Sequence, residues 1–334
     1  MSATPIPANP AYSTPLGASY VGDAMQLLAE LPDNSINLVI TSPPFALQRQ
    51  KAYGNCDQAE YVDWLLGFGK LVYQKLREDG SFVLDLGGAY HKGVPVRSLY
   101  KFRVLLRFCD ELNFHLAQEF FWHNSSKLPS PIEWVNKRKL RAKDTVNTLW
   151  WFSRSEWPKA DVSKVLTEYS LRMKKLLENP AAFYTPKGRP SGHEIGLAFA
   201  TDNGGAIPSN LLQIPNSESN GVYLGACKEV GAMGHPARFP AKLPEFFIRM
   251  LTDPGDLVVD IFAGSNTTGM VAEAEGRKWL AFEQNREYVA SSVLRFLPKG
   301  ISVARKKQIY TEALDGTPIF VEDETGFQAR LLAV

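Results

Sequence analysis

Short apolar strands alternate with amphipathic helices in two separate stretches of this chain, and this alternation constrains the fold more than any other feature. Each predicted strand is a β-branched or aromatic run that stops at a turn, and apolar residues at helical spacing follow it. The predicted strands are one ending at 20–23 and those at 36–41, 81–86, 116–122, 257–262 and 278–283; the predicted helices are 24–31, 61–76, 102–112, 242–252, 268–275 and 286–296. Such alternation is typical of an α/β domain with a mostly parallel central sheet.

The alternation stops between residues 124 and 234, where Pro, Gly and Asn interrupt the chain repeatedly. Residues 127–189 hold 14 Lys and Arg against 6 Asp and Glu, a local charge of +8. The whole chain holds 37 against 35, a net charge of +2, so the remainder carries −6. A basic segment can be a solvated helix face, or it can displace counterions from nucleic acid phosphates. With 334 residues, the chain exceeds the size of most single cores, which favours one large domain with an insertion.

Cysteine usage and hydropathy set limits on the class of protein. Cys56, Cys109 and Cys227 form no Cys-x-x-Cys pair, so we expect neither a disulfide framework nor a zinc site. His123 and His235 also lack a metal-ligand partner at useful spacing. Neither a secretory signal nor an apolar run of membrane-spanning length is found. We therefore expect a soluble, cytoplasmic protein without a metal.

The segment 260–269 reads Asp-Ile-Phe-Ala-Gly-Ser-Asn-Thr-Thr-Gly and connects a predicted strand to a predicted helix. Small residues at such a turn let backbone N–H groups approach a bound ligand. The segment lacks the lysine of a phosphate-binding P-loop, while Glu283 ends the next strand, where nucleotide-binding folds hold ribose hydroxyls. These features indicate an adenosine-bearing cofactor without a pyrophosphate; the alternative is a purely structural turn. The candidate cofactor residues here are Asp260, Phe262, Gly264, Ser265, Asn266, Thr267, Thr268 and Glu283.

The tetrapeptide Ser42-Pro43-Pro44-Phe45 follows the strand at 36–41, at the strand end where open α/β sheets bind ligands. Two consecutive prolines fix the backbone and remove two N–H donors. Ser42 and the Pro43 carbonyl would then accept hydrogens from an exocyclic amino group, and Phe45 would stack on a planar base. A plain turn after a buried strand is the alternative when the tetrapeptide is considered alone.

The two motifs together resemble those of S-adenosylmethionine-dependent DNA amino-methyltransferases. Because Ser42-Pro43-Pro44-Phe45 precedes the cofactor motif, the order is similar to that of the circularly permuted β group. Serine at the head of the tetrapeptide resembles the cytosine-N4 enzymes, since adenine-N6 enzymes usually carry Asp there. The resemblance covers nearly the whole chain and implies a Rossmann-like methyltransferase fold with an inserted target-recognition region.

The resemblance also implies further cofactor contacts. Asp23 matches the position of an acid that contacts the adenine, although on periodicity alone it is a helix N-cap. His235, Pro236 and Phe239 match the segment that lines the methionine end of the cofactor. Phe239 replaces a frequent Lys, so a charge contact from that position to the cofactor carboxylate is in doubt. Asn266 replaces a commoner Gly, which is tolerable because Asn adopts left-handed backbone more readily than most residues.

The resemblance implies transfer of a methyl group from S-adenosyl-L-methionine to cytosine N4 in double-stranded DNA, as protection within a restriction-modification system. A Pro-Cys dipeptide, which a cytosine-C5 enzyme needs for its nucleophile, does not occur. The implied partners are double-stranded DNA, a second copy if the protein is a homodimer rather than a monomer, and functionally a cognate restriction endonuclease; the implied location is the prokaryotic nucleoid. Similarity to one member suggests CAGCTG as the recognised sequence. An adenine-N6 enzyme and a catalytically silent DNA-binding relative are the alternatives.

The expected organisation follows from these assignments. Residues 1–153 would form the catalytic half with the Ser-Pro-Pro-Phe motif, and residues 154–234 the target-recognition region. Residues 235–298 would form the cofactor-binding half of the same catalytic domain, and residues 299–334 a C-terminal tail.

Overall fold

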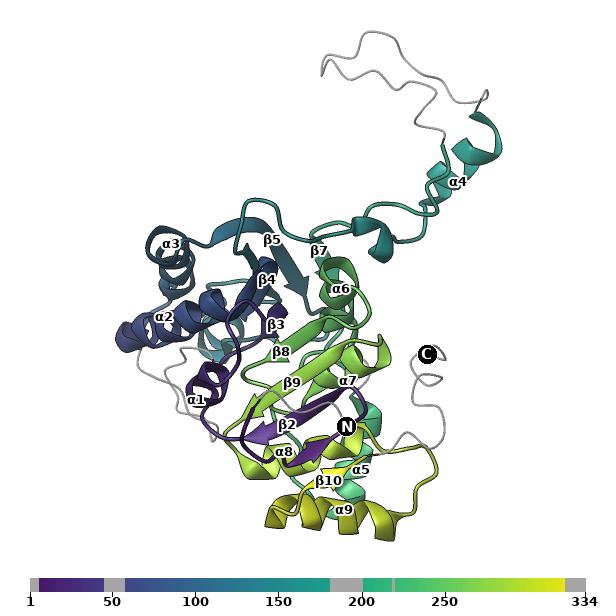
Figure 1. The fold of residues 1–334 in the computed structure, drawn as a ribbon. Coiled ribbons are helices and arrows are strands. Elements are labelled where there is room, and N and C mark those ends of the chain that lie inside the picture. The colour runs from purple at the N-terminus through teal and green to yellow at the C-terminus, as the bar shows by residue number, and fades with distance from the viewer. Residues whose placement is uncertain (1–5, 45–57, 181–200, 218–219, 322–334) are drawn as a thin grey trace. The chain divides into compact units, whose positions relative to one another are not determined.

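A ten-stranded sheet forms the centre of the computed structural model, which describes residues 6–44, 58–180, 201–217 and 220–321 (Figure 1). The strand order is β10-β1-β2-β9-β8-β3-β4-β6-β5-β7. The strands are β1 (Tyr12–Ser13), β2 (Gly17–Val21), β3 (Ile36–Thr41), β4 (Leu76–Leu86), β5 (His115–His123), β6 (Val146–Ser153), β7 (Leu211–Gln213), β8 (Leu257–Asp260), β9 (Lys278–Glu283) and β10 (Ile319–Phe320). Parallel pairs predominate, which confirms the predicted mostly parallel sheet.

Five neighbouring strands, β2, β9, β8, β3 and β4, are mutually parallel, and their carboxyl ends therefore share one edge of the sheet. Val39 of β3 pairs with Val259 of β8, although most of the chain lies between them. Motifs that are far apart in the sequence can therefore lie next to each other in the fold. The segments after Thr41, Asp260 and Glu283 lie together because their strands are parallel neighbours.

Helices cover the two faces of this sheet (Figure 1). They are α1 (Ala24–Ala29), α2 (Gln58–Lys75), α3 (Tyr100–Leu112), α5 (Gly221–Val230), α6 (Lys242–Leu251), α7 (Thr267–Ala274), α8 (Arg286–Ser292) and α9 (Val303–Asp315). Helix α2 packs against α1 and α3, whereas α6 packs against α7, and α9 against α5 and α8. In α6 the apolar side chains of Leu243, Phe247, Ile248 and Leu251 recur at helical spacing, and all four are buried. Burial of each such side chain contributes about 1.5 to 3 kcal/mol, which fixes the helix to the sheet.

Several elements differ from the sequence expectation. Strand β6 was not predicted; it pairs antiparallel with β4 and β5 and buries Trp150 and Trp151 in the sheet. Strand β8 ends at Asp260, and α8 ends at Ser292 before a short 3-10 turn. The C-terminal region contributes α9 and β10, the latter paired with β1.

Residues 161–209 form a second compact unit, while residues 1–160 and 210–334 form the first. The described part of the second unit contains a 3-10 turn (Val162–Val165), helix α4 (Leu171–Glu178) and a bridge between Thr167 and Ala206. Its limits are narrower than the 154–234 of the expected recognition region, and that region's boundaries stay a prediction. Within the described residues, no helix is long and apolar enough to cross a membrane.

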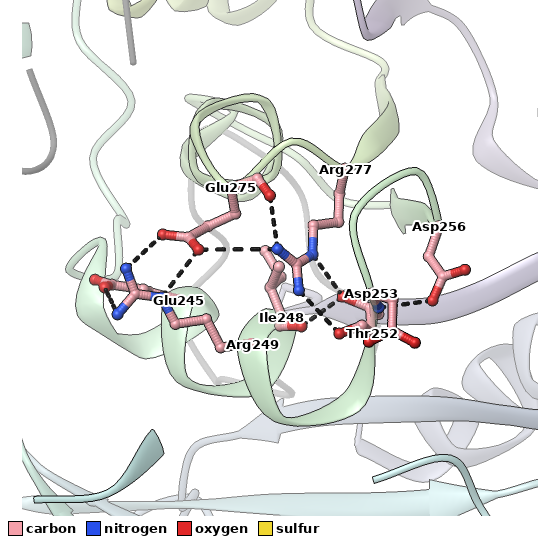
Figure 2. A network of polar contacts seen from close by, with 8 residues as sticks. All are labelled: Glu245, Ile248, Arg249, Thr252, Asp253, Asp256, Glu275 and Arg277. Carbon is pink, nitrogen blue, oxygen red and sulfur yellow. Dashed lines mark hydrogen bonds and ion pairs between the residues drawn. The ribbon is translucent and has the colours of Figure 1, made fainter. Parts of the chain in front are cut away.

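A polar network connects the end of α6 to the turn between α7 and β9 (Figure 2). The Arg277 side chain is 5% exposed and donates to the Thr252 Oγ1 and carbonyl oxygen, at 3.1 and 2.9 Å, and to the Glu275 carbonyl at 2.6 Å. The Arg249 guanidinium donates twice to the Glu275 carboxylate, at 2.7 and 2.9 Å. Because these groups satisfy buried carbonyls, the network fixes the two turns that precede β8 and β9.

Candidate active site

A cavity of about 960 Å³ opens at the shared carboxyl edge of the parallel strands. The predicted residues that line it are Asp23, Ser42, Pro43, Pro44, His235, Phe239, Phe262, Gly264, Ser265, Thr267 and Glu283. Pro236, Asp260, Asn266 and Thr268 do not line it. Phe45 lies outside the described residues. Residues of both sequence motifs therefore line the same cavity.

The Ser-Pro-Pro-Phe tetrapeptide begins directly after the end of β3. Ser42 is half-buried, and its hydroxyl donates to the Asp85 Oδ2 at 3.0 Å. Since that hydrogen bond uses the only hydroxyl proton, the Ser42 oxygen presents lone pairs for a further donor. Pro43 and Pro44 follow directly and line the same cavity. The arrangement can accept hydrogens from an amino group.

Asp85 was not predicted as a site residue. It lies near the end of β4, is 4% exposed and lines the cavity, and its Oδ1 has no hydrogen-bond partner among the described residues. Burial raises the pKa of Asp85 to about 6, against smaller opposing effects of Ser42, Asn147 and Lys127. A single acid inside an otherwise apolar strand, 81–86, is the sequence signal that could have identified it.

Two residues with left-handed backbone conformation shape the turn after β8, which the sequence predicts to bind the cofactor. Gly264 has φ +51°, and an added Cβ there would lie 3.0 Å from the His235 ring. Asn266 has φ +52°, as its tolerance of left-handed backbone predicts, and its side chain accepts from the Gly269 N–H and donates to the Tyr12 hydroxyl. The side chain thus caps α7 and anchors the turn to β1.

Asp260 supports this turn from inside the protein. Its Oδ1 accepts the Thr41 hydroxyl at 2.6 Å and the Phe262 N–H at 3.1 Å, and its Oδ2 accepts the Thr268 hydroxyl at 2.7 Å. Burial raises its pKa. The carboxyl end of β3 and the turn after β8 are therefore held together by one buried carboxyl group.

Glu283 and Asp23 present acidic groups to the cavity. The Glu283 carboxylate accepts the N–H groups of Gly264 and Asn285 at 3.0 and 2.9 Å, and burial raises its pKa. Asp23 caps α1 through the N–H groups of Met25 and Gln26, which confirms its N-cap role. Each carboxylate has lone pairs beyond these bonds and can accept further donors such as ribose hydroxyls.

Aromatic side chains form the apolar wall of the cavity. Phe262 packs against Trp64 and Phe68, with ring centroids 5.5 and 4.9 Å apart. Trp122 is buried and donates its indole N–H to the Ile214 carbonyl at 2.8 Å, so it is a wall of the cavity. Trp64 and Phe68 were not predicted, because on sequence they are indistinguishable from other apolar residues of α2.

The segment 235–239 lines another part of the cavity. The His235 ring packs edge-on against Tyr288, with centroids 4.5 Å apart, and its backbone N–H donates to the Tyr223 hydroxyl. Pro236 is exposed. Among the described residues, no cluster of three or more His, Cys, Asp or Glu side chains could hold a metal ion.

The sequence profile of the family described as DNA methylase (N6_N4_Mtase) matches residues 36–294, and the chain belongs to this family. The type II methyltransferase M.PvuII of Proteus hauseri is 66% identical over 307 residues, covering 92% of this chain and 91% of that protein. The solved structure of the PvuII DNA methyltransferase, named cytosine-N4-specific, superimposes with a TM-score of 0.78 at 56% identity, over 94% and 98% of the two chains. A DNA modification methylase of Thermus thermophilus, TTHA0409, solved with S-adenosyl-L-methionine, has a TM-score of 0.51 at 20% identity, over 86% and 95%, and shares the fold.

The residues present fit the cofactor that this family implies. Glu283 keeps lone pairs for ribose hydroxyls beside the Gly264 turn, and Phe262 provides an apolar surface for a purine ring. Gly264 has no Cβ that would collide with the His235 ring, so the turn and the 235–239 segment approach closely. The cavity volume is at the upper end of ligand pockets, which leaves room for a cofactor and a planar base together.

Proposed function

We propose that this protein transfers a methyl group from S-adenosyl-L-methionine to the N4 amino group of cytosine in a specific sequence of double-stranded DNA. The observation that carries the proposal is the meeting of Ser42-Pro43-Pro44 with the Gly264 turn and Glu283 around one cavity. The cytosine-N4 specificity named for the PvuII enzyme supports the choice of base.

The target base must leave the DNA stack to reach Ser42, because Ser42 lies within the cavity at the carboxyl edge of the sheet. Extrusion costs on the order of a few kcal/mol, which contacts within the cavity offset. The acceptors at Ser42 and the Pro43 carbonyl favour a base with an exocyclic amino group over one with a carbonyl at that position.

The chemistry rests on the lone pair of N4, which is delocalised into the cytosine ring and is a weak nucleophile. The Ser42 oxygen and the Pro43 carbonyl each accept one amino hydrogen and favour a pyramidal nitrogen with a free lone pair. When bound, the cofactor supplies an electrophilic methyl group on a sulfonium. Orientation of N4 toward that methyl supplies much of the acceleration, and a covalent enzyme intermediate is not needed.

Methylation leaves N4 with one proton too many. Ser42 already donates its own proton to Asp85, so a proton accepted by the Ser42 oxygen can be passed on to the Asp85 carboxylate. A carboxyl group with a pKa of about 6 is a better proton acceptor than an ordinary Asp and is still ionised at neutral pH.

The test is a methylation assay with radiolabelled S-adenosyl-L-methionine and two duplexes of equal composition, one containing CAGCTG and one with that sequence scrambled. Nucleoside analysis is expected to find N4-methylcytosine in the first duplex only. Exclusive formation of N6-methyladenine would refute the choice of base, and absence of methylation with retained DNA binding would favour the silent relative. Methylation confined to a different sequence would refute CAGCTG alone.

The biological setting follows from the proposed methylation. Double-stranded DNA is the substrate, the protein acts on the prokaryotic nucleoid, and the methylation protects DNA from a cognate restriction endonuclease. Analytical ultracentrifugation distinguishes monomer from homodimer, and challenge of methylated plasmid with a CAGCTG-cutting endonuclease tests protection.

A further inference from the structure

The loop between β5 and β6, residues 124–145, begins and ends at the margin of the cavity. His123 of β5 pairs with Val146 of β6, so the two ends of the loop are held side by side. Asn124 and Lys127, near the start of the loop, line the cavity. A side chain on the next residue is therefore close to any base that enters the cavity from DNA.

That next residue is Leu128, which is 81% exposed and is the most exposed aliphatic side chain of the loop. A single exposed leucine is ordinary on a protein surface, but the backbone around this one is stiff. Pro129 restricts the residue before it to extended conformations. The Pro131 carbonyl accepts the N–H groups of Trp134 and Val135, at 3.2 and 3.0 Å. The loop thus holds an apolar side chain in water, beside the cavity, on a backbone with little freedom to withdraw it.

The same loop is basic, which indicates what covers this leucine. Residues 127–143 hold six Lys and Arg against one acid, Glu133, a local charge of +5. Glu133 pairs with Lys137 and Arg138, at 3.2 and 3.0 Å, and its single charge leaves most of the positive charge uncompensated. Lys and Arg side chains displace counterions from the phosphates of nucleic acid. Double-stranded DNA therefore fits this mixed surface, with phosphates beside the cations and bases beside the leucine.

We propose that Leu128 inserts into the base stack of the DNA next to the extruded cytosine and fills the position that this base leaves. The inference rests on the proposed function. Leucine is among the side chains that proteins insert between stacked bases. Insertion transfers the leucine from water to the apolar faces of the bases and so offsets part of the cost of extrusion. Leu128 is a positioning residue, because it acts through the population of the extruded base and touches neither the cofactor nor N4.

The test compares single-turnover methylation of two duplexes that contain the sequence in which the parent forms N4-methylcytosine. In one duplex the target cytosine pairs with guanine; in the other it faces an abasic site, so its extrusion breaks no base pair. Leu128→Ser should methylate the paired duplex about tenfold or more slower than the parent, and the abasic-site duplex within about threefold of it. Leu128→Phe, which keeps a large apolar side chain, should stay within about threefold of the parent on both.

A fluorescence measurement separates extrusion from chemistry. Pyrrolocytosine, whose fluorescence increases when it leaves the base stack, replaces the target cytosine, and S-adenosylhomocysteine replaces the methyl donor. Leu128→Ser should give less than about half of the parent's fluorescence increase at saturating protein, and Leu128→Phe most of it. Leu140→Ser, which removes a 62% exposed leucine from the same loop, is the matched control and should equal the parent in both measurements.

Three results overturn the role of Leu128 and leave the proposed function standing. One is equal slowing of Leu128→Ser on both duplexes, since the side chain would then act on binding or chemistry. The others are a parent-like rate and fluorescence in Leu128→Ser, and a defect of the same size in Leu140→Ser. If the parent forms no N4-methylcytosine in any duplex, the proposed function itself fails, and the role of Leu128 fails with it.

Discussion

Replacement of Asp85 by Asn should make the protein more stable and less active. The parent buries a carboxylate at the end of β4, where Ser42 donates a hydrogen bond at 3.0 Å to Oδ2 and Oδ1 has no partner among the described residues. A neutral side chain of the same shape removes the cost of this buried charge.

The size of the effect follows from the pKa. The pKa of Asp85 rises from 3.8 to about 6 on folding, so the native state binds a proton more tightly than the unfolded state. Stability therefore falls as pH increases through this interval, and the loss is complete above pH 6. A shift of this size corresponds to a penalty of about 3 kcal/mol at pH 8, of which about half has accumulated by pH 5.

Urea unfolding followed by tryptophan fluorescence at pH 5, 6, 7 and 8 measures this penalty. We expect Asp85→Asn to be more stable than the parent by about 1 to 3 kcal/mol at pH 8, with a gain smaller by about 1.4 kcal/mol at pH 5. Asp110→Asn, an exposed change on α3, is the matched control and should follow the parent. The reasoning fails if Asp85→Asn is no more stable than the parent at pH 8.

The same substitution should also change the rate of methyl transfer and its dependence on pH. The parent rate should fall as pH decreases through about 6, because a protonated Asp85 no longer accepts the proton passed on by Ser42. Asp85→Asn should be slower at pH 8 by about a hundredfold or more and should lack this acidic limb. A variant that keeps both the parent rate and the parent pH profile would remove Asp85 from the mechanism.

Three further changes test the site and its support. Ser42→Ala should reduce single-turnover methylation by about a hundredfold while calorimetric cofactor affinity stays within twofold, because only the amino-group acceptor is lost; an unchanged rate would exclude Ser42. Asn266→Ala should lower the free energy of unfolding by about 1 to 3 kcal/mol. The variant loses the cap on α7 and places a residue with a Cβ but no local hydrogen bond at φ +52°. Asn266→Gly, which tolerates this backbone conformation, should lose less stability. Arg277→Met should destabilise by about 3 kcal/mol, because the carbonyls of Thr252 and Glu275 lose their donor (Figure 2), and a stability equal to the parent's would show that the network is dispensable.

Periodicity predicted the elements that position the site. The strands at 36–41 and 278–283 have the predicted limits, and the helix at 242–251 differs by one residue, because strongly patterned apolar faces define them. Periodicity did not predict β6: it lies in a segment that begins with polar residues, and its apolar run includes two tryptophans that also suit a surface with basic residues. Its assignment depends on pairing with β4 and β5, which are distant in sequence.

The motifs predicted the candidate site only in part. Ser42 and Glu283 were identifiable because each follows or ends a strand, where parallel sheets place ligands. Asp85 was not, because its significance depends on its burial and on the hydrogen-bond partner that its Oδ1 lacks among the described residues, and neither is visible in a local pattern. Asp260 was assigned to the cofactor from its place in the motif; both of its oxygens accept hydrogen bonds within the protein, and its contact with the cofactor stays a prediction.

The buried charge of Asp85 implies that activity and stability oppose each other in this cavity. Asp85 lies buried beside Ser42 with one carboxylate oxygen that no described residue contacts by a hydrogen bond. If the protein needed this group only for folding, a neutral side chain would serve better, since an unpaired buried charge is destabilising. Its cost is explained if the carboxylate accepts the proton that the base amino group passes on through Ser42. A proton acceptor close to the reacting nitrogen is thus retained although it makes the folded chain less stable.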